Sequence, residues 1–255
     1  MKWRLLDLRT YNAYWNMAID EAILEARIKN IVPNTFRIYR WNPSAVSIGR
    51  HQGMYDEVDI ENCKKLHIDF VRRISGGGAV YHDYNGEITY SIVAKQSELP
   101  QDIDETFKIL CRGIINTLGK FGLEAMHGKF HCPSIFVHNR KISGNAQARR
   151  RGVILQHGTI LLDYNPELMY TVLKVKRPNM KSRLVKSVYQ KVTTVKNEIN
   201  QIPEIDQFKD SLIEGYEKAF NIKFSSPEEL TPEEFNIAKE LVETKYSTDE
   251  WNFKY

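Results

Sequence analysis

A run of three glycines between an arginine pair and a His-Asp pair constrains this chain more than any other feature: residues 72–83 read RRISGGGAVYHD. Because glycine has no side chain, a ligand can approach the backbone N–H groups, which can converge on phosphate or carboxylate oxygens. The two arginines offer forked donors for the same anion. The loop is neither a Walker A motif nor a dinucleotide fingerprint, since no Lys-Ser/Thr follows and no helix signal opens there. A plain hairpin turn beside surface arginines is the alternative.

The pattern of apolar residues predicts strands in the first two thirds of the chain and helices in the last third. Strands are expected at 35–39, 45–48, 68–71, 87–93, 134–142 and 153–162, and helices at 17–27, 104–118, 205–220 and 232–245. Thr231, directly before Pro232, is the expected N-cap of the last helix. This order favours an α+β fold with a mixed sheet over a doubly wound fold. A minor boundary near 197–203 makes roughly 200–253 a helical C-terminal portion.

Composition excludes several classes of protein. The 255 residues are 42% hydrophobic and 27% charged, which argues against wholesale disorder. No long apolar run or signal-peptide stretch occurs, so we expect a cytoplasmic protein without a membrane partner. The net charge of +4 does not call for nucleic acid, and the three cysteines lack zinc or disulfide spacing. Residues 174–191 carry seven Lys or Arg and no acid, which suits an acidic partner or a phosphate, with a solvated face as the alternative.

Four separated blocks resemble the lipoate–protein ligase A family, which includes octanoyltransferases and is related to the biotin–protein ligases. They are SIGRHQ at 47–52, the glycine run at 72–83, RKISGNAQ at 140–147 and LQHGTILL at 155–162. Residues 246–253, YSTDEWNF, resemble the end of the ligase catalytic domain. The likeness covers 1–253 and implies an α+β catalytic domain, biotin/lipoate protein ligase-like, with a central mixed β-sheet flanked by helices. The accessory C-terminal domain of long ligases is expected to be absent.

The resemblance implies, as the main interpretation, the catalytic subunit of a two-part lipoate–protein ligase. Such a ligase activates lipoate (or octanoate) with ATP and Mg²⁺ to acyl-AMP. It then transfers the acyl group to a lysine of a lipoyl-carrier protein, either a lipoyl domain or a glycine cleavage carrier protein. A separate accessory subunit is expected to assist.

The family motifs also imply which residues form the site. Lys141 is the expected catalytic residue, where an ammonium would stabilise developing negative charge. The residues expected to bind ATP and the acyl-adenylate are Arg73, Gly76, Gly77, Gly78, Ala79, Val80, Tyr81 and Lys141. The candidates for the acyl pocket are His82, Gly144, Ala146, His157, Gly158 and Thr159. No carboxylate cage is evident, so no magnesium ligand is assigned.

Residues 131–137, HCPSIFV, depart from the ligase pattern, because the Asn-Asp pair of family ligases is missing and Cys132 is present. Octanoyltransferases of this superfamily take the acyl chain from acyl carrier protein on a cysteine thiolate. Such a thiolate is stabilised by a neighbouring lysine, here Lys141. The alternative function is therefore a cysteine-dependent octanoyltransferase with Cys132 as nucleophile and no need for ATP. An ordinary packing role for Cys132, and a non-catalytic lipoate-binding protein, are further alternatives, the latter disfavoured by the intact Arg73 and Lys141.

Overall fold

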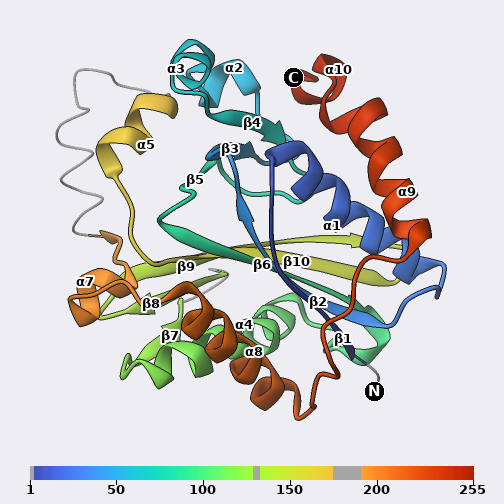
Figure 1. The fold of residues 1–255 in the computed structure, drawn as a ribbon, viewed down its shortest axis with the longest axis vertical. Coiled ribbons are helices and arrows are strands. Elements are labelled where there is room, and N and C mark those ends of the chain that lie inside the picture. Colours follow the sequence, from blue (N-terminus) through green and yellow to red (C-terminus); the bar gives the residue numbers. More distant parts are fainter. Residues whose placement is uncertain (1–2, 129–132, 175–190) are drawn as a thin grey trace.

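Two sheets form the framework of the protein (Figure 1). The computed structural model describes residues 3–128, 133–174 and 191–255. The seven-stranded sheet has the order β1-β2-β6-β10-β9-β8-β7, and the three-stranded sheet has the order β4-β3-β5. The strands of the large sheet are β1 Trp3–Tyr11, β2 Asn34–Trp41, β6 Glu87–Lys95, β10 Val153–Leu161, β9 Arg140–Arg150, β8 Ser134–Val137 and β7 Ala125–His127. Those of the small sheet are β4 Asp69–Arg72, β3 Ala45–Ile48 and β5 Val80–His82.

Both sheets are mixed, because one strand pair in each is parallel and the others are antiparallel. In the large sheet β1 and β2 are parallel, and in the small sheet β3 and β4 are parallel. The long antiparallel pairings of β10 with β6 and with β9 form the centre of the large sheet. The predicted α+β fold with a central mixed sheet flanked by helices is confirmed.

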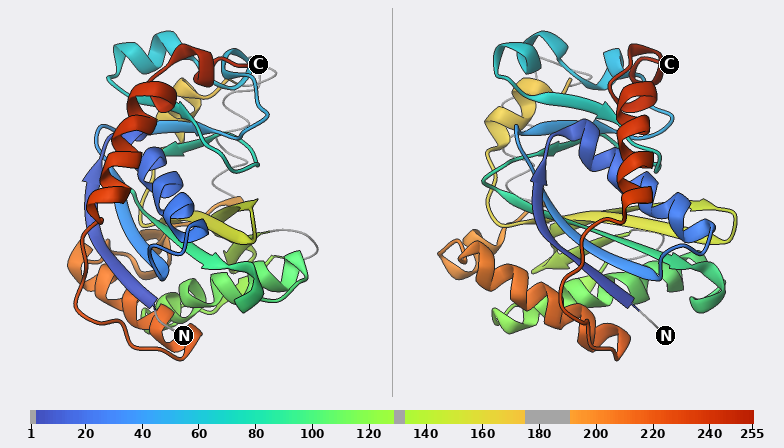
Figure 2. Two further views of the ribbon diagram at one scale, coloured as in Figure 1. Left: turned by 90° about the vertical axis from the view of Figure 1, so that its right-hand side faces the viewer. Right: turned by 45° about the vertical axis from the view of Figure 1, so that its right-hand side comes forward.

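Helices cover both faces of the large sheet (Figures 1 and 2). The longer ones are α1 Ala13–Ile28, α4 Ile103–Lys120, α8 Ile205–Phe220 and α9 Pro232–Leu241. The shorter ones are α2 Met54–Glu57, α3 Ile60–Lys65, the 3₁₀ turn η1 Gln96–Glu98, α5 Pro166–Val172, α7 Val195–Ile199, the π-helical turn η3 Val242–Tyr246 and α10 Asp249–Asn252. Helices α4 and α8 lie on one face, and α1 with α9 lies on the other, beside the small sheet.

Two apolar clusters hold these layers together. Leu110 and Ile114 of α4 pack with Phe208 and Leu212 of α8 under the large sheet. Ile19 and other apolar residues of α1 pack with strands β2 and β10 and with α9 on the opposite face. Apolar side chains at helical spacing on each helix therefore meet alternate side chains of the sheet. The helical C-terminal portion contributes to both clusters.

Most predicted elements are confirmed, with boundary corrections that have local causes. Helix α8 has the predicted bounds, and Thr231 caps α9 in a capping box with Glu234. Helix α1 begins four residues earlier than predicted, because Asn12 accepts a hydrogen bond from the Trp15 N–H. The predicted strand 134–142 is wrong in its length: His138 and Asn139 both have positive φ, so the chain turns between β8 and β9.

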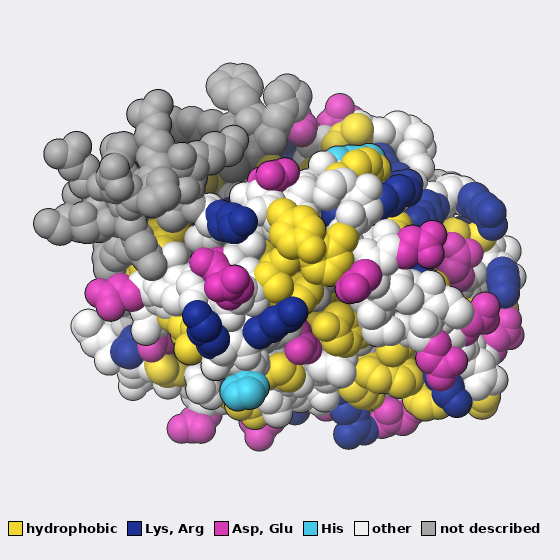
Figure 3. Space-filling model, turned by 90° about the horizontal axis from the view of Figure 1, so that it is seen from above, with side chains coloured by type: hydrophobic (Ala, Val, Ile, Leu, Met, Phe, Trp, Pro, Cys, Tyr) yellow, Lys and Arg dark blue, Asp and Glu magenta, His cyan; other side chains and the backbone are white. Residues whose placement is uncertain are grey.

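The surface seen from above mixes both signs of charge (Figure 3). Basic and acidic side chains are interspersed there among several groups of hydrophobic side chains. Of the seven basic residues predicted to form a patch at 174–191, Lys174 and Lys191 are described and the other five lie outside the described residues. Within the described ranges, no helix is long and apolar enough to cross a membrane.

Candidate active site

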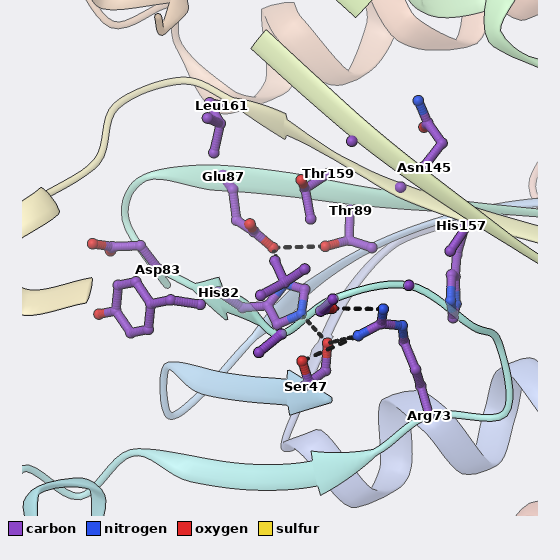
Figure 4. Close-up of a pocket in the computed structure, with 18 of the residues that line it drawn as sticks. Ser47, Arg73, His82, Asp83, Glu87, Thr89, Asn145, His157, Thr159 and Leu161 are labelled. Carbon is purple, nitrogen blue, oxygen red and sulfur yellow. Dashed lines mark hydrogen bonds and ion pairs between the residues drawn. The ribbon is translucent and has the colours of Figure 1, made fainter. Parts of the chain in front are cut away.

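A cavity of about 450 Å³ lies between the small sheet and the face of the large sheet that α1 also covers (Figure 4). Of the predicted site residues that are described, all but Gly76 line it. They are Arg73, Gly77, Gly78, Ala79, Val80, Tyr81, His82, Lys141, Gly144, Ala146, His157, Gly158 and Thr159. The glycine run, the lysine block and the strand after it therefore meet around one cavity, although they are distant in the chain. Cys132 lies outside the described residues.

Arg73 is buried behind the glycine loop, and its five N–H groups are directed at protein acceptors. Nη2 donates to the carbonyls of Gly76 and Gly78, each at 2.8 Å. Nε donates to Ser75 Oγ at 3.1 Å, and Nη1 lies 3.1 Å from the carbonyl and 3.3 Å from the Oγ of Ser47. Burial lowers the pKa of Arg73 to about 10, so the guanidinium stays charged at neutral pH. Arg73 thus acts as a charged support for the loop.

The direction of the loop carbonyls fixes the direction of the loop N–H groups. In a trans peptide the N–H points opposite to the preceding carbonyl, so the N–H groups of Gly77 and Ala79 point away from Arg73. Gly49 lies tightly under the turn, because a Cβ there would stand 2.0 Å from the carbonyl oxygen of Gly77. Gly77 itself has φ of +97°, which favours glycine. The loop, whose residues Gly77 and Ala79 line the cavity, therefore holds these two N–H groups in a fixed direction away from Arg73.

A first Ser–His–carboxylate chain runs from Arg73 to helix α1. Ser75 Oγ lies 2.6 Å from His157 Nε2, and His157 Nδ1 lies 3.0 Å from Asp20 Oδ2. Because Nδ1 faces a carboxylate it carries the ring proton, and Nε2 accepts from Ser75. Burial lowers the pKa of His157, which keeps the ring neutral. Three further side chains donate to Asp20: Arg37 at 2.7 Å, Ser91 at 2.8 Å and Tyr39 at 3.0 Å.

A second chain of the same kind also starts at Arg73. Ser47 Oγ lies 2.8 Å from His82 Nε2, and His82 Nδ1 lies 2.7 Å from Glu87 Oε1. Thr89 donates to the same Oε1 at 2.8 Å. The ring of His82 stacks on Trp41 with centroids 4.0 Å apart. Both chains border the cavity, and Figure 4 shows Ser47, His82 and Glu87 on one side of it.

Strands β8 and β9 bring Lys141 close to the start of β8. A Cβ on Gly144 would stand 2.8 Å from Lys141 Nζ, so the ammonium lies over this glycine. Gly144 pairs with Ser134, the second residue after Cys132 in the chain. Pro133 lines the cavity, and its carbonyl accepts a hydrogen bond from the Asn145 amide at 2.7 Å. Lys141 therefore lies beside the strand end that follows Cys132.

The other two cysteines are unsuited to nucleophilic chemistry. Cys63 on α3 and Cys111 on α4 are both buried, and burial raises the pKa of each thiol to about 12. Neither lines the cavity. A thiolate at neutral pH would have to come from Cys132, since the chain has three cysteines.

The sequence did not single out several residues of the cavity wall. Ser47 stands in the SIGRHQ block, but nothing in that block marked it as a partner of His82. Glu87 and Asp20 read as an ordinary strand residue and an ordinary helix residue, and the tertiary fold alone brings them to the two histidines. Among the described residues, no group of three His, Cys, Asp or Glu side chains could hold a metal ion.

Comparison with known proteins identifies the class. The family model of the lipoyl protein ligase A/B catalytic domain matches residues 12–217, so the chain belongs to this family. The bi-partite lipoate protein ligase of Thermoplasma acidophilum has a TM-score of 0.87 and 31% identity, over 99% of this chain and 96% of that chain. A lipoate-protein ligase A bound with ATP has a TM-score of 0.84 and 30% identity, over 99% of both chains.

The curated relatives narrow the class. Octanoyltransferase LipM of Geobacillus kaustophilus (strain HTA426) is 35% identical over 99% of this chain and 98% of its own length. Octanoyltransferase LipM of Clostridioides difficile (strain 630) is 34% identical over 99% of both chains. These full-length relatives overturn the main sequence-based interpretation, so the expectation of an ATP-dependent lipoate–protein ligase is wrong. The expected use of ATP and Mg²⁺ as cofactors, and the expected accessory subunit, were inferred from that interpretation.

Proposed function

We propose that this protein is an octanoyltransferase, which moves an octanoyl group from acyl carrier protein to a lysine of a lipoyl domain. The observation that carries the proposal is the similarity of the whole chain to octanoyltransferases, at 34–35% identity. The cavity between the sheets is lined by apolar side chains such as Met17, Met169 and Leu173, which suits an acyl chain.

The proposed reaction has two steps with Cys132 as the nucleophile. Its thiolate attacks the carrier thioester, the C–S bond to the carrier breaks, the carrier leaves as a thiolate that takes a proton from solvent, and an octanoyl thioester forms on Cys132. The amine of the acceptor lysine then attacks this thioester, an amide forms, and the Cys132 thiol is regenerated. Both steps place negative charge on the same carbonyl oxygen, which the N–H groups of Gly77 and Ala79 are oriented to receive.

Lys141 fits the role of the charge that supports the thiolate. An ammonium next to a cysteine stabilises its ionised form, and Lys141 Nζ lies over Gly144, which pairs with the start of β8. The high pKa values of Cys63 and Cys111 leave Cys132 as the candidate nucleophile of the chain.

The test is a single-turnover reaction with octanoyl acyl carrier protein, in the absence of ATP and Mg²⁺. Intact mass should show an octanoyl adduct that is absent in Cys132→Ala and retained in Cys63→Ala, the matched control. Lys141→Ala should slow formation of the adduct about 10²–10³-fold, as expected for loss of a charge-stabilising donor. Adduct formation in Cys132→Ala, or a strict requirement for ATP, would refute the proposal.

A further inference from the structure

Glu87 lines the cavity, and one of its two carboxylate oxygens has no hydrogen-bond donor among the described residues. The side chain is 1% exposed, and Oε1 accepts from both His82 and Thr89. Oε2 is buried, and none of the described residues donates a hydrogen bond to it. A buried carboxylate oxygen without a donor is costly, because it has lost its water and gained no replacement. Such an oxygen in a cavity wall indicates a ligand that brings a donor.

The first Ser–His–carboxylate chain shows what a complete arrangement looks like in the same protein. Asp20 accepts from His157, Arg37, Ser91 and Tyr39, so both of its oxygens are satisfied. Its charge is balanced by the guanidinium of Arg37. Glu87 has no such permanent cation: among the described residues it forms an ion pair with His82 alone, which is charged only when the ring is protonated. Both chains run from a serine through a histidine to a carboxylate. Only the chain that ends at Glu87 has a carboxylate oxygen without a donor among the described residues.

The substrates of the proposed transfer differ in what they could offer Glu87. The octanoyl group brings methylenes and a carbonyl oxygen, none of which donates a hydrogen bond. The acceptor lysine brings a primary ammonium with three N–H donors and a positive charge. A buried carboxylate favours such a cation, because opposite charges attract strongly where water is excluded.

We propose that Glu87 is the binding position of the acceptor amine: its open Oε2 holds the ammonium of the acceptor lysine and takes up the proton that the amine loses. This inference rests on the proposed function and assigns its second step. One ammonium proton passes to Glu87, and the freed lone pair forms the new C–N bond. The C–S bond breaks, its electron pair stays on sulfur, and the second amine proton goes to that thiolate. Glu87 then returns its proton to solvent.

The experiment separates the two steps in the variant Glu87→Gln, which keeps the shape and removes the charge. The octanoyl enzyme should form within about twofold of the wild-type rate, whereas its discharge to an apo E2 lipoyl domain should slow on the order of 100-fold. Hydroxylamine, which is uncharged at neutral pH, should discharge both proteins equally. Loss of both discharge reactions to the same extent, or unchanged transfer to the lipoyl domain, would overturn the inference.

A matched control separates this role from a general effect of altering a buried carboxylate. Glu234 is fully buried, pairs with Arg4 and lies outside the cavity. Glu234→Gln should lower stability and leave both discharge rates of the folded enzyme unchanged. Should Glu87→Gln fail to fold, Glu87→Asp keeps the charge one methylene shorter and should slow discharge to the lipoyl domain alone.

A binding measurement tests the inference without any chemistry. Affinity for the apo lipoyl domain is compared with that for its variant in which the acceptor lysine is replaced by methionine, using wild-type enzyme and Glu87→Gln. The two losses should overlap, so that the double change weakens binding little more than either single change. Fully additive losses would contradict the inference. If the wild-type enzyme formed no octanoyl adduct, the proposed function would be refuted. The binding comparison would then still test whether Glu87 contacts the acceptor lysine.

Discussion

Two Ser–His–carboxylate chains start at Arg73 and consist of the same kinds of group. Every oxygen of the carboxylate has a hydrogen-bond donor in one chain, whereas one carboxylate oxygen of the other chain has none among the described residues. The chain through Ser75 and His157 ends on Asp20, where four side chains donate. The chain through Ser47 and His82 ends on Glu87, where one oxygen is open. The saturated chain fixes the glycine loop to the core, and the open one retains capacity for a substrate. Residue type alone therefore does not separate structural from chemical roles, whereas a count of donors does.

The largest expected effect comes from removing the origin of both chains. In Arg73→Met, the carbonyls of Gly76 and Gly78 lose their donor and the loop N–H groups lose their orientation. Transfer should fall about 10²-fold or more, as for other misplacements of reacting groups by about 1 Å. Steady-state octanoyl transfer measures the loss. Arg27→Met, which removes a largely buried arginine remote from the cavity, is the control and should keep the rate. Equal rates in the two variants would show that the loop keeps its place without Arg73.

The next largest expected effect is a difference in the free energy of unfolding between variants of Asp20 and Glu87, the carboxylates at the ends of the two chains. Asp20→Asn leaves the buried guanidinium of Arg37 without its partner, so the free energy of unfolding should fall by about 3 kcal/mol or more. Glu87→Gln removes a carboxylate that balances no buried arginine and should cost clearly less. Urea denaturation of both variants makes the comparison. A larger loss in Glu87→Gln would reverse the assignment of structural and open chains.

The smallest effect is a change in the pH dependence of stability. Because burial lowers the pKa of His157, the unfolded chain takes up its proton first as the pH falls below about 6.5. The contribution of this residue is therefore complete above that pH and is lost as the solution becomes more acidic. Wild type should lose stability between about pH 6.5 and 5, and His157→Gln should show a shallower loss. Identical slopes in denaturation curves across this window would contradict the expectation.

Local signals in the sequence were sufficient for most of the fold and for part of the site. Helical spacing gave the bounds of α8, and Thr231 before Pro232 gave the start of α9. The motif blocks led to residues that line one cavity, because a glycine run and a lysine shortly before a Ser-Gly pair are recognisable from the sequence alone. Ser47, Asp20 and Glu87 were missed, since their function depends on strand pairing and helix packing between distant segments.

The same local sequence motifs could not distinguish a ligase from a transferase. The glycine loop and Lys141 are compatible with a phosphate oxygen or with an acyl carbonyl, because oriented N–H groups and an ammonium stabilise both. The break between β8 and β9 at His138 and Asn139 was also missed, although histidine and asparagine are among the residues that most often adopt a positive φ. Whole-chain similarity supplied what the motifs lacked.

The close approach of Gly49 to Gly77 has a consequence for engineering of the substrate range. A methyl group at position 49 would stand 2.0 Å from a backbone oxygen, so the floor beneath the turn cannot be rebuilt by small steps. Met169 of α5 and Leu173, the residue that follows this helix, contribute apolar side chains to the lining of the cavity. Libraries that seek longer or shorter fatty acids should therefore vary these two positions and keep residue 49 fixed.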